Sequence, residues 1–427
     1  TYLRQAAKRG YIPACVRLAE IYSQGKGIAP DLREAANWYR QAAELGDVPS
    51  QFALGRLYAT GQGVAPNLRL AASWFSRAAE KGHATAAYNL ATFYAKGDGV
   101  PRDLDQALAW YKVAADKGFV LAQLQLGRIY SAGSGVPRDT ATAVDWLEKA
   151  STSGHADAQI VLAMTYLQND SATRNPTRAV ELLESCAKSG KATAALRLAE
   201  LYDGTVAGLP LDQERANRHY LDAANAESAE AQYKLALRLL AGEFIPRNPS
   251  DALAWLIRAA EQNHLGAQFR LAVLYCQGRD IPADLKQGAA WYQRAAEGGH
   301  VVSQYNLAVM LTKGQGCEPD QAAAVAWFEK AAQQNMVEAQ IKLVEAYAAD
   351  PDAIVKEDEA RLWYEKANKT PVGSSRLAHL AHLFATSSQT ESPAIVDIDR
   401  DTASPPGSQI KAASDEADRQ KRTPSPL

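Results

Sequence analysis

Residues 86–118 read AAYNLATFYAKGDGVPRDLDQALAWYKVAADKG. The first half places apolar and small residues around Leu90 at spacings of three and four, which gathers them on one face of an α-helix. Gly97 and Gly99 then interrupt the pattern, and Asp103 follows as a typical helix N-cap. The second half resumes helical spacing around Trp110 and ends at a glycine. The stretch therefore predicts two helices joined by a Gly-rich turn.

This pattern recurs along the chain with a period of 36 residues. All eight tryptophans stand at one phase, with successive spacings of 36, 36, 36, 109, 36, 36 and 36 residues. They are Trp38, Trp74, Trp110, Trp146, Trp255, Trp291, Trp327 and Trp363. A leucine recurs in the same register at Leu18, Leu54, Leu90, Leu126, Leu162, Leu198, Leu235, Leu271, Leu307 and Leu343. Two independent markers thus predict about ten helix-turn-helix repeats.

The residues at the starts and ends of the predicted helices support this interpretation. The first helix of a repeat ends in a Gly-x-Gly pair, which we interpret as a helix stop because glycine admits the left-handed backbone. The second helix begins at an Asp or Asn and carries a Trp-Tyr or Trp-Phe pair. We expect every tryptophan to pack between helices, so that Trp110→Ala costs roughly 3–5 kcal/mol. The chain is predicted to be an all-α solenoid.

With these residues in place, the chain resembles the Sel-one-like repeats, a branch of the tetratricopeptide-related helical repeats. Residues 86–118 match this pattern almost throughout, and similar units cover residues 1 to about 370. The resemblance implies a right-handed α/α superhelix. It also implies an adaptor in multiprotein assemblies, often at cell envelopes or secretory membranes.

The repeat register divides the chain into four parts. Residues 1–13 read as the second helix of a truncated repeat, so we expect further sequence to precede them. Residues 14–373 hold the ten repeats, and residues 374–385 read as a C-terminal capping helix. Residues 386–427 are rich in Ser, Pro, Asp and Thr and are predicted to be disordered.

The fifth and sixth repeats, residues 158–230, depart from the pattern. Leu182 and the pair Arg218-His219 stand where Trp-Tyr is expected, and the loop from Gln168 to Arg174 has no glycine. Drift in a tolerant loop explains this, and so does a bend or a partner-specific site in the middle of the solenoid. The sequence leaves both open.

Composition narrows the classes of partner. The 427 residues include 47% hydrophobic and 22% charged residues, with a formal net charge of -2, so nothing indicates nucleic acid as a partner. We find no run of the roughly 18 apolar residues that a membrane span needs. A soluble chain is expected, in the periplasm, associated with the envelope or in the cytoplasm.

The sequence gives only weak signals for catalytic or metal-binding residues. His83, His155, His264 and His300 recur at one slot of the repeat, roughly 10 Å apart by helix packing distances, so we interpret them as turn residues and not as metal ligands. The segment from Ser185 to Lys188 has the Ser-x-x-Lys spacing of penicillin-binding enzymes but lacks their companion motifs. We expect no catalytic residue, no metal and no cofactor.

The sequence thus favours a scaffold that binds proteins or peptides. An envelope hydrolase or penicillin-binding activity, suggested for a cysteine-rich branch of the family, remains an alternative, as does a purely structural spacer. Two residues before the repeat leucine, the first helices carry aromatic side chains that either pack between repeats or contact a partner. With two arginines on the same side, the candidate protein-binding residues are Phe52, Arg56, Tyr88, Arg128, Tyr233, Phe269 and Tyr305.

Overall fold

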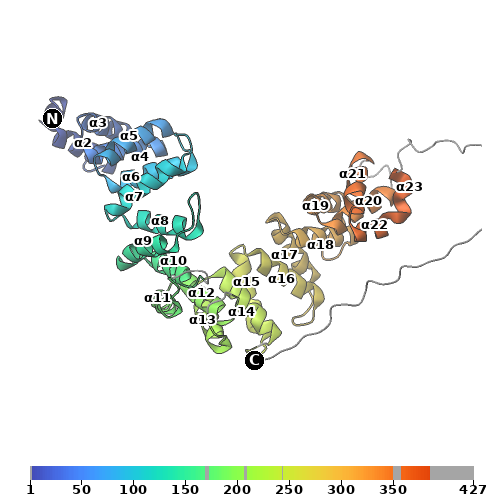
Figure 1. Ribbon diagram of the computed structural model, residues 1–427. Coiled ribbons are helices and arrows are strands. Elements are labelled where there is room, and N and C mark those ends of the chain that lie inside the picture. Colours follow the sequence, from blue (N-terminus) through green and yellow to red (C-terminus); the bar gives the residue numbers. More distant parts are fainter. Residues whose placement is uncertain (1, 169–172, 206–208, 243, 350–356, 385–427) are drawn as a thin grey trace, which may run out of the picture.

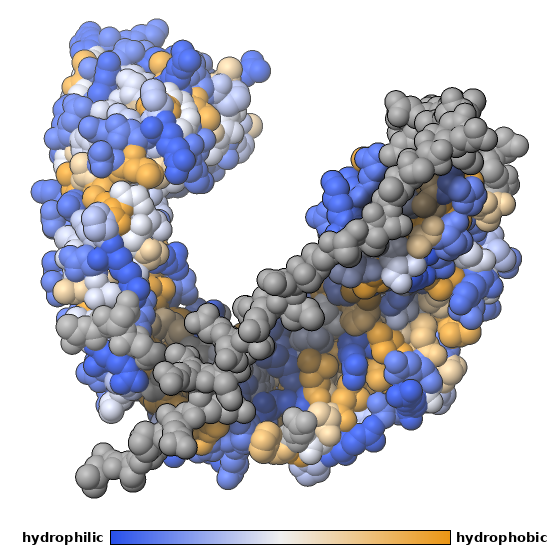
Figure 2. All heavy atoms as spheres, turned by 45° about the vertical axis from the view of Figure 1, so that its right-hand side comes forward, coloured by the Kyte–Doolittle hydropathy of each residue, from blue (hydrophilic) through white to orange (hydrophobic). Residues whose placement is uncertain are grey.

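The computed structural model describes residues 2–168, 173–205, 209–242, 244–349 and 357–384. Within these residues every regular element is a helix. Helices that follow one another in the sequence pack against each other, and the stack curves into an open arc (Figure 1). In the space-filling view the two limbs of the arc stand apart around a hollow (Figure 2). The predicted all-α solenoid is confirmed.

Each repeat contributes two helices joined by a turn. The first helices are α2 (Ile12–Gln24), α4 (Val48–Thr60), α6 (Ala84–Lys96), α8 (Val120–Ala132), α10 (Ala156–Tyr166), α12 (Ala192–Tyr202), α14 (Ala229–Ala241), α16 (Leu265–Gln277), α18 (Val301–Lys313) and α20 (Val337–Ala349). The second helices are α3 (Leu32–Glu44), α5 (Leu68–Glu80), α7 (Leu104–Asp116), α9 (Thr140–Thr152), α11 (Pro176–Lys188), α13 (Gln213–Asn225), α15 (Pro249–Glu261), α17 (Leu285–Glu297), α19 (Gln321–Gln333) and α21 (Glu357–Asn368).

Short helices flank these repeats. Helix α1 (Tyr2–Lys8) precedes them, and α22 (Pro371–Leu377), the 3₁₀ turn η1 (Ala378–Leu380) and α23 (Ala381–Phe384) follow them. The expected cap at residues 374–385 is thus two short helices that begin three residues earlier, at Pro371, where Thr370 caps the helix. The tail expected at residues 386–427 lies outside the described residues.

Helix starts and stops follow the sequence signals. Each second helix from α3 to α19 begins at an Asp or Asn whose side chain accepts a hydrogen bond from a backbone N–H two or three residues later. First helices of the regular repeats end at a glycine with positive φ, such as Gly61 at 72° and Gly97 at 83°. The Asp and Asn side chains bond to backbone N–H groups that the start of a helix leaves free, and the glycines adopt the left-handed backbone that ends a helix.

Three histidines of the recurring slot begin first helices. His83, His264 and His300 are N-caps, and Nδ1 of each accepts a hydrogen bond from the backbone N–H three residues later. Burial lowers the pKa of His83 and of His300. A neutral ring is required here because a protonated Nδ1 accepts no hydrogen bond.

In six of the repeats, a buried glutamine links the first helix to the helix before it. Its Nε2 donates to a backbone carbonyl eight residues earlier, in the last turn of the preceding second helix. The glutamines are Gln51, Gln123, Gln232, Gln268, Gln304 and Gln340, all less than 9% exposed. This bond satisfies a carbonyl that the helix end leaves free, and it crosses from one repeat to the next.

The two glycines of the Gly-x-Gly pair have different roles. The first ends the helix, but the second lies against the second helix of the preceding repeat. A Cβ placed on Gly63 would lie 2.1 Å from the carbonyl oxygen of Leu32, and one on Gly99 would lie 2.3 Å from the carbonyl carbon of Leu68. The interpretation of both glycines as helix stops was therefore incomplete, because the second permits close approach between repeats.

The tryptophans are less buried than expected. Trp38, Trp74 and Trp363 are buried, whereas the other five, including Trp110, are half-buried. Where the tryptophan is half-buried, the residue that follows it is the deeper one, as at Tyr111, which is 4% exposed. In these five repeats the next side chain along the helix therefore contributes more to the core than the tryptophan that marks the period.

The fifth and sixth repeats differ as the sequence indicated, with one correction. Their first helices, α10 and α12, have 11 residues instead of the 13 of the regular first helices. In α13 the Trp-Tyr position falls on His219-Tyr220 and not on Arg218-His219, because it lies seven residues after the N-cap Asp212 as in other repeats. Tyr220 is 1% exposed and occupies the core position.

We predict that Gly99→Ala destabilises the fold more than Gly118→Ala. Both glycines have positive φ, 69° and 80°, so each substitution incurs about 1–2 kcal/mol of backbone strain. Only at Gly99 would the added Cβ clash with a neighbouring residue, since a Cβ on Gly118 meets nothing within 4 Å. Urea unfolding is expected to show a further loss of about 1–3 kcal/mol for Gly99→Ala. Equal losses of unfolding free energy in the two variants would contradict the close contact between Gly99 and the preceding second helix.

A second prediction compares adjacent side chains of α7. Tyr111→Ala is expected to lower the free energy of unfolding by about 3–5 kcal/mol, and Trp110→Ala by clearly less, because the indole is already half exposed. Tyr111→Phe is the control, since it removes only the contact of 3.2 Å between Tyr111 and Thr92 hydroxyls. A larger loss for Trp110→Ala in thermal or urea unfolding would refute this ranking.

The capping histidines predict a pH dependence of stability. The pKa values of His83 and His300 in the folded chain lie below that of free histidine, about 6.5, so the unfolded chain binds protons first as the pH falls. The free energy of unfolding should therefore decrease below pH 6.5 until the folded pKa values are passed. Replacing His83 and His300 by Asn keeps a capping side chain and should flatten this decrease. A slope unchanged by the double substitution would argue against the role.

Candidate functional site

The candidate aromatic residues of the first helices are half-buried and pack against the second helix of their own repeat or the residue that caps the next first helix. Phe52 stacks on His83 with ring centroids 4.5 Å apart, and Tyr88 lies 5.6 Å from Tyr111 and 5.2 Å from Phe119. The later repeats repeat this arrangement, with contacts Tyr233–His264, Phe269–His300 and Tyr305–Phe328 at 4.6, 4.7 and 5.6 Å. In each case the partner ring belongs to the next second helix or precedes the next first helix.

The two candidate arginines are exposed. Arg56 projects from α4 and Arg128 from α8, each two residues after the repeat leucine. Arg128 also lines a pocket, so it lies beside apolar residues of the neighbouring repeat. The structure thus places the candidate aromatics against neighbouring helices and the arginines on the open surface.

This pocket spans three consecutive first helices, α8, α10 and α12. The ribbons of α8 and α10 lie on the inner side of the arc (Figure 1). The volume of the pocket is about 290 Å³. We call it the first-helix pocket, and it is lined by Arg128, Ser131, Asp157, Ile160, Val161, Met164, Thr165, Gln168, Thr193 and Arg197. It forms where α10 contacts α8 directly, so the first helices approach each other closely here.

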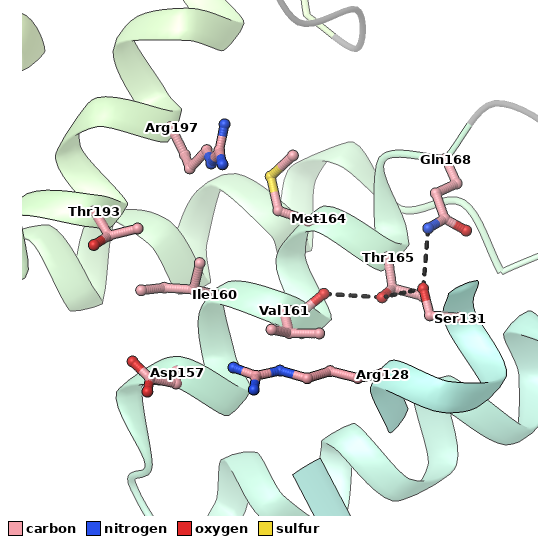
Figure 3. A pocket seen from close by; sticks show the side chains of 10 residues that line it. All are labelled: Arg128, Ser131, Asp157, Ile160, Val161, Met164, Thr165, Gln168, Thr193 and Arg197. Carbon is pink, nitrogen blue, oxygen red and sulfur yellow. Dashed lines mark hydrogen bonds between the residues drawn. The ribbon is translucent and has the colours of Figure 1, made fainter. Parts of the chain in front are cut away.

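The lining combines an apolar centre with charged and polar edges. Ile160 and Val161 lie between Arg128 and Arg197, and the Arg128 side chain extends toward Asp157 (Figure 3). On the remaining side, Gln168 donates to the Ser131 hydroxyl at 3.0 Å, and Ser131 lies 3.3 Å from the Thr165 hydroxyl. These hydrogen bonds hold the polar side chains at this edge of the pocket in place.

A chain of charges continues from this pocket along the first helices. Glu200, 6% exposed, accepts from Arg197 and from Lys234, both at 2.7 Å. Lys234 lies 3.6 Å from Glu230, which accepts from His264 Nε2 at 2.9 Å. Since His264 Nδ1 accepts the capping hydrogen bond, its Nε2 carries the proton. Opposite charges thus alternate across α12 and α14, and the last carboxylate accepts from His264 at the start of α16.

Sequence reasoning missed Val161, Met164 and Arg197. They stand one residue before or two residues after the repeat leucine, at the edge of the buried stripe. The signal was available in the variation at that second position, which holds Arg56, Thr92, Arg128, Met164 and Glu200 in successive repeats. A position that has the same place in every repeat but a different side chain from repeat to repeat is suited to recognising a specific partner.

The tryptophans of the second helices are mostly covered by their own helix. A Lys or Arg three residues after the tryptophan lies over the indole at 3.8 to 4.8 Å. The pairs are Trp74–Arg77, Trp146–Lys149, Trp255–Arg258, Trp291–Arg294, Trp327–Lys330 and Trp363–Lys366. These rings are therefore less available to a partner.

The Ser-x-x-Lys segment lies on the surface of α11. Ser185 and Lys188 are exposed, and the Lys188 ammonium lies 3.8 Å from Glu184 instead of contacting the hydroxyl. Among the described residues, no group of three or more His, Cys, Asp and Glu side chains is arranged to hold a metal ion. No helix in the described ranges is long and apolar enough to span a membrane.

Comparisons with known proteins agree with this architecture. Ten segments match the family model described as Sel1 repeat, at residues 12–47, 48–83, 84–119, 120–155, 156–191, 192–228, 229–264, 266–300, 301–336 and 349–369. A comparison with curated proteins finds no match. The chain is similar to c5321, a protective antigen of uropathogenic Escherichia coli strains with an SLR fold, at 31% identity over 91% of this chain and 83% of that chain, with a TM-score of 0.56.

It is also similar to a Sel1 repeat protein from Oxalobacter formigenes, at 29% identity over 81% of this chain and 89% of that chain, with a TM-score of 0.53. The family model covers most of the chain, and both structures share its repeat architecture. The chain therefore belongs to the Sel1 repeat family.

Proposed function

We propose that this chain is a protein–protein interaction scaffold that catalyses no reaction itself and assembles a multiprotein complex of the cell envelope or the secretory route. Its first-helix surface holds an extended segment or a helix of the partner, with the first-helix pocket at the centre. The proposal rests on one observation above all, an open pocket built by three consecutive repeats with an apolar centre between two arginines.

The chemistry of this pocket suits a polypeptide partner. Ile160, Val161 and Met164 offer apolar contact area, and methionine adapts its shape to different partners. Arg128 is exposed and makes no hydrogen bond or ion pair with the described residues, so its guanidinium is available to a carboxylate or a backbone carbonyl. Arginine and well-packed apolar anchors dominate protein-binding hot spots.

The remaining candidate residues extend this surface along the arc. Arg56 is exposed at the position equivalent to that of Arg128, two repeats earlier. The rings two residues before the repeat leucine are held by the second helix of their own repeat or by the residue that caps the next first helix, and they offer only their exposed edges to a partner. These are Phe52, Tyr88, Tyr233, Phe269 and Tyr305. Their packing fixes them in place, so binding orders few side chains.

The test is capture of partners by the purified chain, followed by quantitative mass spectrometry. Arg128→Glu and Met164→Glu are each expected to reduce capture of the same proteins about tenfold, because each places a buried charge in the interface. Arg69→Glu is the matched control, since it makes the same charge change at an exposed position of the second helix α5. Undiminished capture by both folded variants would place the site elsewhere.

A further inference from the structure

Aliphatic side chains occupy part of the first-helix surface in the seventh, eighth and ninth repeats. The position two residues after the repeat leucine, which also lines the first-helix pocket, holds Leu237, Val273 and Val309 here, all half-buried. Val302, 41% exposed, precedes Val309 by about two helical turns and therefore shares its face of α18. We call these four residues the α14–α18 surface, after the three consecutive first helices that carry them.

Arg270 lies on this surface without a carboxylate partner. It stands three residues before Val273, so the two side chains share a face of α16. Arg270 makes no hydrogen bond or ion pair with the described residues, and its Nε is buried without a partner. Four other repeats place a cation directly before the repeat leucine, and each of these cations contacts a glutamate at 2.7 to 3.1 Å. The four pairs are Arg17–Glu20, Arg197–Glu200, Lys234–Glu200 and Lys342–Glu345.

The sequence explains why Arg270 is unpaired. The other cations find their carboxylates at three places, which are three residues later, four residues earlier, or two residues after the leucine of the preceding repeat. For Arg270 these places hold Val273, Gly266 and Leu237. A half-buried guanidinium among apolar side chains attracts a carboxylate strongly, because the surroundings screen the charges less than water does. The α14–α18 surface therefore suits an occupant with aliphatic side chains beside a carboxylate.

One segment of this chain has that chemistry. Residues 395–399 read IVDID, so that large aliphatic residues stand directly beside Asp397 and Asp399. The segment lies outside the described residues. In the rest of residues 386–427 the only other large aliphatic residues are Ile410 and Leu427. The aliphatic residues of this part of the chain are thus concentrated where two carboxylates accompany them.

The described part of the chain ends within reach of this surface. Phe384 packs against Tyr347 of α20 with ring centroids 5.9 Å apart. One first helix, α18, stands between α20 and α16 in the chain order of the solenoid (Figure 1). With neighbouring first helices roughly 10 Å apart, Arg270 lies about 20 Å from α20. The 13 residues from Phe384 to Asp397 can span at most about 45 Å, so the distance is easily covered.

We propose that residues 395–399 bind to the α14–α18 surface of their own chain, with the aliphatic side chains against it and a carboxylate of Asp397 or Asp399 paired with Arg270. This docking does not depend on the scaffold function. Its consequence does, since a partner that uses the same first helices must displace the segment. The segment then restricts this part of the first-helix surface to partners that bind more tightly than it does.

The first experiment compares whole chains with isotope-labelled Ile, Leu and Val methyl groups. Replacing Ile395 and Ile398 by Ser changes no residue of the described helices, so the solenoid stays intact. The methyl resonances of the α14–α18 surface are expected to differ between this double variant and the unchanged chain. Ile410→Ser is the matched control and should leave them in place. Identical resonances in the double variant, or differences confined to Ile160 and Val161 of the first-helix pocket, would overturn the proposal.

The second experiment adds a synthetic peptide of residues 392–401. It is expected to bind the Ile395→Ser, Ile398→Ser double variant with a dissociation constant on the order of 0.1 mM, typical of a short segment. Binding to the unchanged chain should be at least fivefold weaker, because a segment on a short linker competes at an effective concentration of about 1 mM. Equal affinity for the two chains, or no saturable binding, would contradict docking of the segment.

Charge reversal tests the pairing with Arg270. Added to the double variant, Arg270→Glu should weaken binding of the peptide at least tenfold, whereas Arg279→Glu, at an exposed position after α16, should not. A peptide with Lys at both aspartate positions is expected to prefer the Arg270→Glu chain, which a merely misfolded variant would not produce. An unchanged preference for the original peptide would show that Arg270 does not hold a carboxylate.

Dilution distinguishes the chain's own segment from that of a second copy. Docking within one chain predicts that the methyl differences persist unchanged over a tenfold dilution, and their disappearance would refute it. These experiments need no partner protein, so their failure leaves the scaffold function standing. Likewise, undiminished capture by Arg128→Glu leaves the docking of residues 395–399 standing.

Discussion

The interface between one repeat and the next is the contact on which the rest of the structure depends. Consecutive helices pack in chain order, so a repeat buries its apolar side chains only against its neighbours. Small residues make this possible, because Ala and Gly let helices approach closely, and the second glycine of the turn lets a loop lie against a backbone carbonyl. The buried glutamines then bond one repeat to the helix end of the previous one. The arc follows from the repetition of this interface.

The interface changes in the middle of the chain. Where Gly99 or Gly316 lies against the preceding helix in the regular turns, the seventh repeat has Phe244, with φ of 62° and 68% exposed. Polar bonds replace the glycine contact there, including Asn217 to the Phe244 carbonyl at 2.7 Å and Arg138 to Gln168 at 2.6 Å. Polar contacts near the surface contribute less than close backbone packing, because water competes for them. The first-helix pocket lies in this part of the arc, so the least regular interfaces coincide with the surface proposed for binding.

Periodicity predicted the fold because two markers, Leu90 and Trp110, recur in one register and the caps agree with them. It did not predict the glutamine bonds, since their acceptors lie on another helix, or the second role of Gly99, since glycine serves both roles. The position of His219 was misplaced by one residue because the 36-residue period was applied across a repeat that contains one extra residue, whereas the spacing of seven residues from the N-cap Asp212 gives His219. For the candidate site, Arg56 and Arg128 were predicted, but Met164 and Arg197 were not, because a slot that varies from repeat to repeat leaves no periodic signal.

Native-state hydrogen exchange, resolved by helix, tests the central claim that interfaces between neighbours hold this fold. If glycine contacts and glutamine bonds strengthen an interface, amides of α4 to α7 should exchange with a higher free energy of opening than those of α10 to α13. The account predicts a minimum of protection in the fifth and sixth repeats, away from both ends of the described arc. Uniform protection from α4 to α19, or a maximum at α10 to α13, would contradict it.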